Sequence, residues 1–568
     1  MKLLEHFKEL SLHTKNAEEL KGLILQLAVQ GKLTANWRER NPIKQTSEEL
    51  LDIINQGKIE VLLDSGVKKE KPIDEFDIQE VKFELPKSWV WVRFTSTAYI
   101  CRGGSPRPIK NYITEDPNGI NWIKIGDTKG VLKYIEKCKE KIIPEGLKMS
   151  RLVKPGDFIL SNSMSFGKPY IMKTSGCIHD GWLLIREVKE AINKDYLYHM
   201  LSSPYVYSSF KESAAGGVVQ NLNIEKVRQT LIPIPPLEEQ KAIVEVVNTL
   251  FAEVEQLESL TKERIQLKES FVVSALNKLT ITENTQQEWN FLQPHFSSFF
   301  TEKKNIQSLR ETILQLAVQG KLTENWRANN PNTEPASELL KRIEAEKQQL
   351  IAEKKIKKEK PLPPIKEDEK PYELPKGWVW CRLGEAGFTQ TGSTPPKKNP
   401  EYYGDFIPFI GPADITNQWM KYPKEGLSEK GIAVGRLIPE NSTMMVCIGG
   451  SIGKCNINEI DVSCNQQINT ITPIYNMPVM IRTICQSPYF QNEVWENSSG
   501  SATPIINKGK WENIVVPIPP LEEQQAIVEK VNSLMALCDE LEQQIDNSQT
   551  QIEQLMQSCL KEVFDTCV

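Results

Sequence analysis

The stretch that decides the fold is ILQLAVQGKLT at Ile24–Thr34, because the same eleven residues return at Ile313–Thr323. In both copies one further residue and then Asn-Trp-Arg follow. Two other stretches also return, FELPKSWVWVR of 83–93 as YELPKGWVWCR of 372–382, and PIPPLEEQKAIVEVVN of 233–248 as PIPPLEEQQAIVEKVN of 517–532. A repeat of this length predicts two copies of one architectural unit in a single chain.

The residues between these landmarks differ between the copies. Roughly Thr95–Thr230 and Gly384–Asn513 share only short islands, such as Ser203-Pro204-Tyr205 against Ser487-Pro488-Tyr489. A constant scaffold with two unlike insertions favours one frame that presents two different binding surfaces. Neutral drift of surface loops after a duplication is the alternative, but drift should also have eroded the helical landmarks.

Composition sets bounds on the class of protein. At 568 residues and 39% hydrophobic content the chain can form several domains, and no apolar run reaches the roughly 18 residues of a membrane span. Eleven cysteines without a C-x-x-C pair argue against a disulfide framework and a zinc site, which favours a reducing cytoplasm. The net charge of −5 excludes a uniformly basic face, so nucleic acid would have to meet local patches or a larger complex.

Motifs for catalysis are missing from the sequence. The five histidines lack metal-ligand spacing, and the Asn-Pro-Pro-aromatic or Asp-Pro-Pro-aromatic tetrad of amino-methyltransferases does not occur. The stretch Gly449–Lys454 is one residue too short for a phosphate loop and is followed by Cys455 instead of Ser or Thr. We therefore expect a protein that binds and organises, with no catalytic residue and no metal ligand of its own.

Apolar residues at heptad spacing follow each proline motif. Leu237-Glu238-Glu239 places acidic residues in the first turn of a helix. Steps of four and three then relate two series of residues, Ile243, Val247, Leu250, Val254 and Leu257 in the first copy and Ile527, Val531, Leu534, Cys538, Leu541 and Ile545 in the second. We expect long helices over about 237–278 and 521–562, each about 60 Å long, that pair antiparallel. A helix packed only on its own domain is the alternative.

The two ends of the chain extend the repeat. Residues 1–33 match 290–322, including His6-Phe7 against His295-Phe296. If the first helix packs beside the last one, the repeat closes into a pseudo-circular arrangement. Charged stretches such as 68–72 and 357–361 separate each LAVQGKLT helix from its tryptophan motif; they could be basic arms, but their interleaved glutamates favour solvated linkers.

The variable regions read as mostly β-structure, and each begins with a polar, glycine-containing loop, RGGSPRPIK at 102–110 and TGSTPPKK at 391–398. Glycine permits close approach of backbone to a ligand, hydroxyl groups donate to phosphate oxygens, and Arg or Lys pairs with phosphate or a guanine edge. An ordinary charged surface turn is the alternative. The candidate DNA-binding residues are Arg102, Ser105, Arg107, Lys110, Ser393, Thr394, Lys397 and Lys398.

The order of these motifs, repeated twice, resembles the specificity subunit of type I restriction–modification enzymes over nearly the whole chain. The resemblance implies that two target recognition domains each read one half of a split DNA site. It implies that the paired helices space the domains and dock two methyltransferase subunits, with motor–nuclease subunits added outside. S-adenosylmethionine, ATP and magnesium are then expected on the partners and none on this chain. Asn465-Gln466-Gln467 fits the family's tendency, whereas the first domain has His179-Asp180-Gly181-Trp182, so no role is transferred.

The predicted fold class is α+β, with two mostly-β target recognition domains separated by two long antiparallel coiled-coil helices in a pseudo-two-fold repeat. Because the two domains differ, we expect an asymmetric bipartite target whose halves lie about one helical turn apart, on the order of 34 Å. Two alternatives remain, a stand-alone DNA-binding scaffold or regulator and a self-sufficient DNA-modifying enzyme with an unrecognised site. The predicted domains are an N-terminal helical region (1–40), a charged linker (41–80), recognition domain 1 (81–236), a central helical region (237–328), a second charged linker (329–370), recognition domain 2 (371–520) and a C-terminal helix (521–568).

Overall fold

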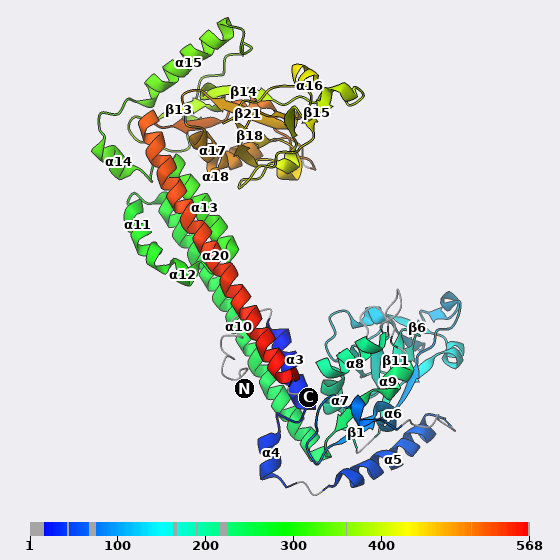
Figure 1. Ribbon diagram of the computed structural model, residues 1–568. Helices are drawn as coiled ribbons and strands as arrows, with labels where there is room; N and C mark the ends of the chain where they lie inside the picture. Colours follow the sequence, from blue (N-terminus) through cyan, green and yellow to red (C-terminus); the bar gives the residue numbers. More distant parts are fainter. Residues whose placement is uncertain are drawn as a thin grey trace. The chain divides into compact units, whose positions relative to one another are not determined.

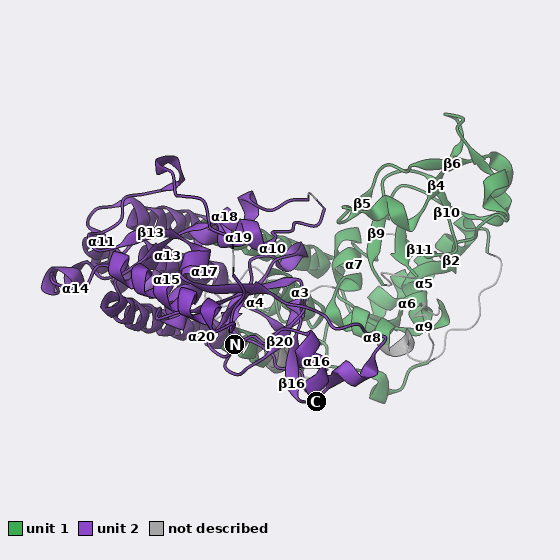
Figure 2. Cartoon of the chain, turned by 90° about the horizontal axis from the view of Figure 1, so that it is seen from above, with its two compact units in different colours: residues 1–264, 550–568 green, residues 265–549 purple. Residues whose placement is uncertain are grey.

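The computed structural model describes residues 16–42, 45–67, 75–162, 167–188, 191–214, 222, 224–358, 360–500 and 502–565. The chain divides into two compact units, residues 1–264 with 550–568 and residues 265–549 (Figure 2). The two longest helices, α10 (Leu237–Ile281) and α20 (Leu521–Asp565), each contribute residues to both units. Within the described ranges, no helix is both long and apolar enough to cross a membrane.

The two long helices form where the heptad pattern predicts them, and each has 45 residues (Figure 1). In the first unit the core contains Ile243 and Val254 from the first half of α10, and Leu555 from the end of α20 packs against it. In the second unit Leu276 from the end of α10 shares a core with Ile527 from the start of α20. In each unit the start of one helix therefore lies with the end of the other, which confirms the antiparallel pairing.

The repeat closes as the chain ends predict. Helix α3 (Asn16–Val29) of the first unit and helix α13 (Lys303–Val318) of the second occupy corresponding places. The Lys21 Nζ lies 2.7 Å from a carboxylate oxygen of Glu255, and Arg310 lies 2.6 Å from Asp539, which is the corresponding position in the second copy. In the second unit α11 (Thr285–Leu292) and α12 (Phe296–Phe299) join α10 to α13. The matching pair His6-Phe7 lies outside the described residues.

A buried carboxylate explains why three distant motifs recur together. Glu239, from the proline motif, is fully buried and accepts hydrogen bonds from the Thr34 hydroxyl at 2.7 Å and the Trp89 indole at 2.9 Å. Arg38, from the Asn-Trp-Arg sequence, forms an ion pair with the same carboxylate and donates to the Gly31 carbonyl at 2.6 Å.

The second unit builds the same junction around Glu523. Thr323 donates to this carboxylate at 2.6 Å, Trp378 at 2.8 Å, and Arg327 pairs with it at 2.5 Å. A buried charge needs this many partners to offset the loss of its hydration. In each unit the three repeated motifs therefore meet at one buried carboxylate. We call this contact, around Glu239 or Glu523, the junction.

The expected charged linkers need correction. Within 41–80 the residues Ser47–Asp64 form helix α5, and within 329–370 the residues Ala336–Ala352 form helix α15. Each helix buries one apolar edge, and in α5 the Lys58 ammonium is also buried and donates to the carbonyls of Thr95 and Ala98 at 2.6 Å. The solvated-linker interpretation was made for 68–72 and 357–361 and does not extend to these two helices, whose charged exposed faces hide a buried edge. The stretch 68–72 lies outside the described residues.

Recognition domain 1 is attached by a two-stranded antiparallel pair, β1 (Val90–Arg93) with β12 (Leu231–Ile234). It contains two five-stranded sheets, with strand orders β2-β11-β8-β9-β5 and β3-β6-β4-β10-β7. The strands are β2 (Ala98–Arg102), β3 (Ile113–Thr114), β4 (Ile120–Ile123), β5 (Tyr134–Ile135), β6 (Glu140–Ile142), β7 (Arg151–Val153), β8 (Phe158–Ser161), β9 (Pro169–Met172), β10 (Gly176–Ile178) and β11 (Trp182–Glu187). The unit's remaining helices are α4 (Ala35–Arg40), α6 (Phe94–Thr97), α7 (Lys194–Leu201), α8 (Pro204–Ala214) and α9 (Ile224–Gln229).

Recognition domain 2 repeats this plan with smaller sheets. The pair β13 (Val379–Arg382) with β22 (Val515–Ile518) attaches it, and its four-stranded sheets have the orders β14-β21-β18-β19 and β15-β17-β16-β20. The strands are β14 (Gly387–Thr391), β15 (Tyr403–Gly404), β16 (Ile407–Ile410), β17 (Gly426–Leu427), β18 (Thr443–Val446), β19 (Cys455–Ile457), β20 (Ser463–Cys464) and β21 (Ile468–Pro473). The unit's remaining helices are α14 (Glu324–Asn329), α16 (Glu429–Val434), α17 (Pro478–Gln486), α18 (Pro488–Glu496) and α19 (Lys508–Glu512).

Candidate nucleic-acid interface

The glycine-containing loop of recognition domain 1 leaves the sheet at the end of β2, beside the turn that precedes β11. Gly103 donates its N–H to the Trp182 carbonyl at 2.8 Å, and Gly104 donates to that of Ile178 at 3.1 Å. A Cβ added to Gly103 would lie 2.1 Å from the His179 carbonyl oxygen. These glycines therefore serve close backbone packing inside the protein, which corrects the expectation that they make room for a ligand.

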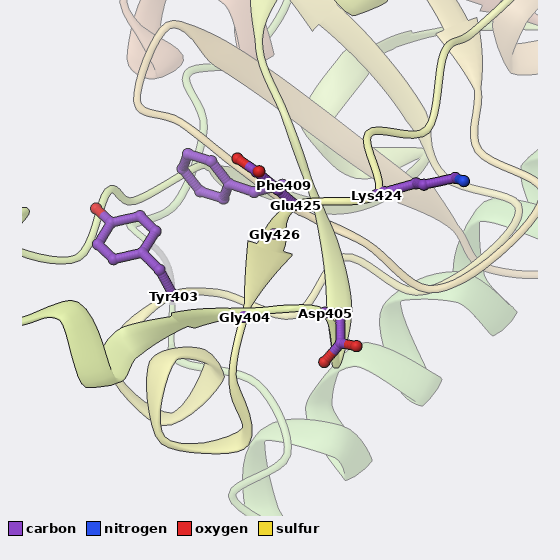
Figure 3. A pocket seen from close by; sticks show the side chains of 7 residues that line it. All are labelled: Tyr403, Gly404, Asp405, Phe409, Lys424, Glu425 and Gly426. Carbon is purple, nitrogen blue, oxygen red and sulfur yellow. The ribbon is translucent and has the colours of Figure 1, made fainter.

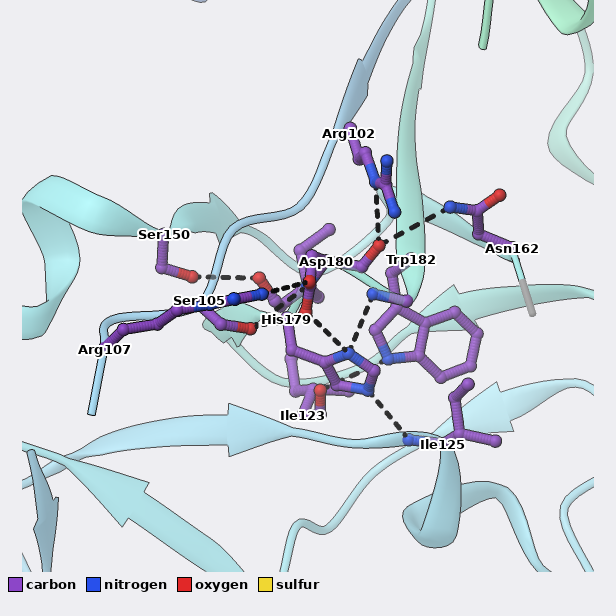
Figure 4. A network of polar contacts seen from close by, with 12 residues as sticks. Arg102, Ser105, Arg107, Ile123, Ile125, Ser150, Asn162, His179, Asp180 and Trp182 are labelled. Atoms are coloured by element: carbon purple, nitrogen blue, oxygen red, sulfur yellow. Dashed lines mark hydrogen bonds and ion pairs between the residues drawn. The ribbon is translucent and has the colours of Figure 1, made fainter. Parts of the chain in front are cut away.

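Three of the candidate residues in this domain converge on Asp180 (Figure 4). The Ser105 hydroxyl donates to one carboxylate oxygen of Asp180 at 2.7 Å, and the Arg107 guanidinium lies 3.3 Å from the other. Arg102 donates to the Asp180 backbone carbonyl at 3.0 Å. Lys110 lies apart from this cluster, is exposed, and makes no ion pair with a described residue. The sequence did not identify Asp180 as the centre of the loop.

The charges of this cluster follow from its contacts. The hydrogen bond from Ser105 lowers the pKa of the Asp180 carboxyl, with smaller contributions from His179 and Arg107. Burial lowers the pKa of the neighbouring His179, so its imidazole is neutral near pH 7. Arg107 keeps 82% of its side-chain area exposed beside a carboxylate that is 42% exposed. The loop therefore presents an arginine whose charge is partly offset by an acceptor at the same surface.

Recognition domain 2 builds the same arrangement from different residues. Gly392 donates to the Ile468 carbonyl at 3.0 Å and Ser393 to the Cys464 carbonyl at 2.8 Å, so they take the places of Gly103 and Gly104. The Thr394 hydroxyl then donates to the side chain of Gln466 at 2.6 Å, as Ser105 does to Asp180. Asp180 and Gln466 are thus structurally equivalent positions.

The remaining candidates of domain 2, Lys397 and Lys398, are exposed and make no ion pair with a described residue. They follow Thr394 on the same loop. The Tyr403 phenol stabilises this loop by donating a hydrogen bond to the Pro395 carbonyl at 2.6 Å. With neutral Gln466 in place of Asp180, this loop carries uncompensated positive charge. The two domains therefore offer unlike chemistry on one backbone plan.

A hollow of about 510 Å³ adjoins the loop of domain 2 (Figure 3). The rings of Tyr403 and Phe409 lie on one side of it, while Asp405 and Lys424 point away from those rings. Gly426 is required at its wall, since a Cβ there would lie 1.9 Å from the Ile407 carbonyl oxygen. The hollow places aromatic surface next to the basic loop.

The equivalence of Asp180 and Gln466 was missed in the sequence, although a signal existed. HDGW at 179–182 and NQQI at 465–468 both lead directly into the strand that pairs with the loop-bearing strand. Aligning the two copies on this strand places Asp180 over Gln466. The two tetrapeptides have no residue in common, so only their position before the strand reveals that Asp180 and Gln466 correspond.

A second candidate surface, in the second unit, lies on the repeated motifs and away from the loops. In the second unit a hollow of about 340 Å³ is bordered by Leu322 and Trp326 from one motif and by Ala526 and Glu529 from the proline-motif helix. The first unit has the same four residue types at the corresponding positions, Leu33, Trp37, Ala242 and Glu245. The repeat thus keeps these four residue types in both units, in contrast to the unlike recognition loops.

Comparison with known proteins agrees with this duplicated plan. The family model described as "Type I restriction modification DNA specificity domain" matches residues 86–269 and 375–551. The EcoAI specificity subunit of Escherichia coli is 30% identical, with 94% of this chain and 92% of the relative covered. The EcoEI specificity subunit of Escherichia coli is 29% identical, with 94% and 91% covered.

Among solved structures, the HsdS subunit from Thermoanaerobacter tengcongensis is similar at a TM-score of 0.45 and 18% identity, covering 86% of this chain and 99% of that one. The family model matches more than half of the chain, in two segments that correspond to the two copies of the repeat. The chain therefore belongs to the type I restriction modification DNA specificity family.

Proposed function

We propose that this chain is the non-catalytic DNA-specificity subunit of a type I restriction–modification complex and that each recognition domain reads one half of an asymmetric bipartite target. The observation that carries this proposal is the pair of unlike loops on one backbone plan, with Asp180 in the first domain and Gln466 at the equivalent place in the second. Two identical readers would match a symmetric site, whereas unlike readers match unlike halves.

The chemistry of the two positions supports different base preferences. A carboxylate accepts hydrogen bonds only and suits the amino group of cytosine, whereas a glutamine side chain both donates and accepts and suits adenine. The exposed cations Arg107, Lys397 and Lys398 supply contacts to phosphate or to a guanine edge. Arg102, Ser105, Ser393 and Thr394 hold the loops in place, and Lys110 contacts the backbone of the DNA.

Exchange of residues 95–230 for those of another family member tests the independence of the readers. We expect the methylated motif of the host genome to change in one half only, because the exchanged residues lie within recognition domain 1. A change in both halves would contradict the proposal. The single substitution Gln466→Ala should relax preference in the other half, at a cost of about 1–3 kcal/mol against the preferred base.

The salt dependence of DNA binding separates phosphate contacts from base contacts. Lys397→Ala should weaken binding to all sequences and lower the slope of log K against log salt by about one, because one counterion fewer is released. Arg107→Ala should be combined with Asp180→Asn, since loss of the arginine alone would leave an unpaired carboxylate facing the DNA. Unchanged affinity and slope in both variants would make these loops ordinary charged turns.

We propose the hollow beside Trp326, and the matching residues around Trp37 in the first unit, as docking surfaces for two methyltransferase subunits. These subunits would bring S-adenosylmethionine, while ATP and magnesium belong to motor–nuclease subunits. A half-buried tryptophan at the edge of a shallow hollow is typical of interface anchors. We expect Trp326→Ala to leave one methyltransferase subunit bound and the double variant with Trp37→Ala to leave none, as counted by native mass spectrometry. Two subunits bound to the double variant would contradict this assignment. The free thiols of all nine described cysteines support a reducing compartment such as the cytoplasm as the place of action.

A further inference from the structure

Recognition domain 2 contains a polar pocket that neither the recognition loop nor the docking surface uses. It has a volume of about 470 Å³ and is lined by the loop that carries Trp419, by β19 and Glu459 after it, and by α17 with Arg482. Trp419 is half exposed, with 52% of its surface free, so part of its side chain is available to a ligand. Tyr422 also borders the pocket.

Among the described residues, no carboxylate pairs with the partly buried Arg482 side chain. Its Nε is buried without a hydrogen bond, and among the described residues the guanidinium forms no ion pair. Burial lowers the pKa of this group, and the Cys455 thiol opposes the effect. Buried cations are ordinarily paired, because an unpaired one loses hydration without compensation. An unpaired arginine in the wall of a pocket therefore indicates that an anion binds there.

The corresponding position in the first unit has a different residue and no unpaired arginine. Tyr198 occupies the position of Arg482, five residues before Ser203-Pro204-Tyr205 as Arg482 is before Ser487-Pro488-Tyr489. The cation beside it, Lys133, is 2.6 Å from Asp195 and 4.8 Å from the Tyr198 ring. Tyr198 also donates to the Leu132 carbonyl at 2.9 Å. In the first domain the positive charge is thus compensated within the protein.

The pocket wall in the second domain is firmly built. The Asn417 side chain accepts from the Cys455 N–H at 3.0 Å, and Asn456 donates to the Thr416 carbonyl at 3.1 Å. Gln486 of α17 donates to the Asn417 carbonyl at 3.0 Å and the Cys455 carbonyl at 2.8 Å. These contacts fix the Trp419 loop against β19 and α17, so the pocket does not depend on a freely moving loop.

We propose that this pocket binds a nucleotide whose base carries an amino group, with Arg482 pairing with the phosphate and Trp419 stacking on the base. Arginine pairs with phosphate through two parallel hydrogen bonds, and tryptophan stacks on any base. Glu459 is exposed at the same pocket and disfavours a purely anionic ligand. An amino group such as that of adenine or cytosine would satisfy this carboxylate. The nucleotide is either free or part of a DNA strand, and the chemistry of recognition is the same.

Titration of the full-length protein with adenosine 5′-monophosphate tests the proposal without DNA. We expect binding by calorimetry, a loss of at least tenfold in affinity in Arg482→Gln, and a loss in Trp419→Ala. Inosine 5′-monophosphate, which lacks the amino group, should bind more weakly. The matched control is Arg342→Gln, since Arg342 on α15 is exposed and already paired with Glu334 at 2.7 Å; its affinity should equal that of the wild type.

Thermal unfolding distinguishes a lost ligand site from a damaged fold. Because Arg482 is unpaired, Arg482→Gln should be at least as stable as the wild type without ligand, yet it should show no increase in Tm with the nucleotide. A large fall in Tm without ligand would mean that the arginine has a structural partner, which contradicts the proposal.

The source of the phosphate is decided by DNA binding at several salt concentrations. If the free nucleotide binds and the salt slope of Arg482→Gln is unchanged, the ligand is a small molecule. If the free nucleotide does not bind but the slope falls by about one, the phosphate belongs to DNA. Absence of both effects would overturn the proposal, whereas failure of all DNA binding would affect only the function proposed above.

Discussion

Glu239 and Glu523 show how single residues account for the recurring motifs. Each carboxylate receives donors from two other motifs of its own unit, and each is almost completely buried. Gly31 and Gly320 belong to the same junctions, because both have φ of +70° and a Cβ there would lie within 2.7 Å of a proline Cγ. Selection on this one site preserves motifs that are far apart in the chain.

Glu239→Gln should therefore destabilise the first unit by about 3 kcal/mol, because it leaves Arg38 without its counter-charge at a buried position. Hydrogen exchange is the suitable measurement, since it reports the two units separately. Exchange should rise in α3 and β1 but not in α13. The control Glu255→Gln removes an exposed ion pair with Lys21 and should change stability by at most about 1 kcal/mol. Equal effects of the two substitutions would contradict the role assigned to Glu239.

His199 makes the first unit sensitive to acid. Burial lowers its pKa from 6.5 to about 4, and the ring packs edge-on against Phe251. As pH falls, the unfolded chain takes up the proton before the folded one, so stability is lost between about pH 6.5 and pH 4 and is unaffected above that range. The loss reaches about 3 kcal/mol at the lower end.

The His199→Phe variant should show a flatter dependence of stability on pH over this interval. Urea unfolding of wild type and variant at pH 7, 6, 5 and 4 provides the measurement. If both lose stability equally, other groups account for the acid sensitivity. A matched control is Tyr207→Phe, which changes an exposed ring of the same domain and should leave the pH dependence as it is.

At the scale of elements, a long apolar periodicity predicted the helices correctly, whereas a short one did not. The heptad pattern placed α10 and α20 within a few residues, because an apolar seam of that length has one structural solution. Helix α5 was missed because its buried edge is short and includes Lys58 beside Leu50, Ile54 and Val61. A lysine in a core is not visible as such in a sequence, since its burial depends on carbonyls supplied by another segment.

Lys58→Met should loosen α5, because the Thr95 and Ala98 carbonyls would lose their donor in a buried place, at a cost of about 1–3 kcal/mol. Limited proteolysis within 45–67 should become faster while the rest of the unit stays intact. Glu60→Gln on the exposed face of the same helix is the control and should leave the cleavage rate unchanged. If Lys58→Met is as resistant as the wild type, the buried ammonium does not hold the helix.

The recognition loops mark the limit of what the sequence alone could reveal. The candidate residues were located on the correct loops, but their partners Asp180 and Gln466 come from more than 70 positions further along the chain. The hydrogen bonds also changed the meaning of the glycines, which serve packing rather than access. Both facts depend on strand register, and register is set by tertiary pairing of strands that are remote in sequence.

At the scale of the whole molecule, the duplication combines a scaffold that is the same in both units with recognition loops that differ. The junctions around Glu239 and Glu523 belong to the constant part, because the same residue types form them in both units. The loops around Asp180 and Gln466 belong to the variable part. One chain can thus acquire a new half-site without altering its assembly, because no described contact of either loop involves a junction residue.

If the two readers are independent, their contributions to DNA affinity must add. We expect Lys110→Ala in the first unit and Lys397→Ala in the second each to weaken binding, and the double variant to lose the sum of the two effects within about 0.5 kcal/mol, because the residues share no partner. Fluorescence anisotropy with one labelled duplex at one salt concentration gives the four affinities of the cycle. Lys397→Ala with Lys398→Ala is the control cycle, since neighbouring cations on one loop should not add so simply. A coupling energy above about 1 kcal/mol between Lys110 and Lys397 would mean that engagement of one half-site alters the other, and the reading of the target would then be cooperative instead of modular.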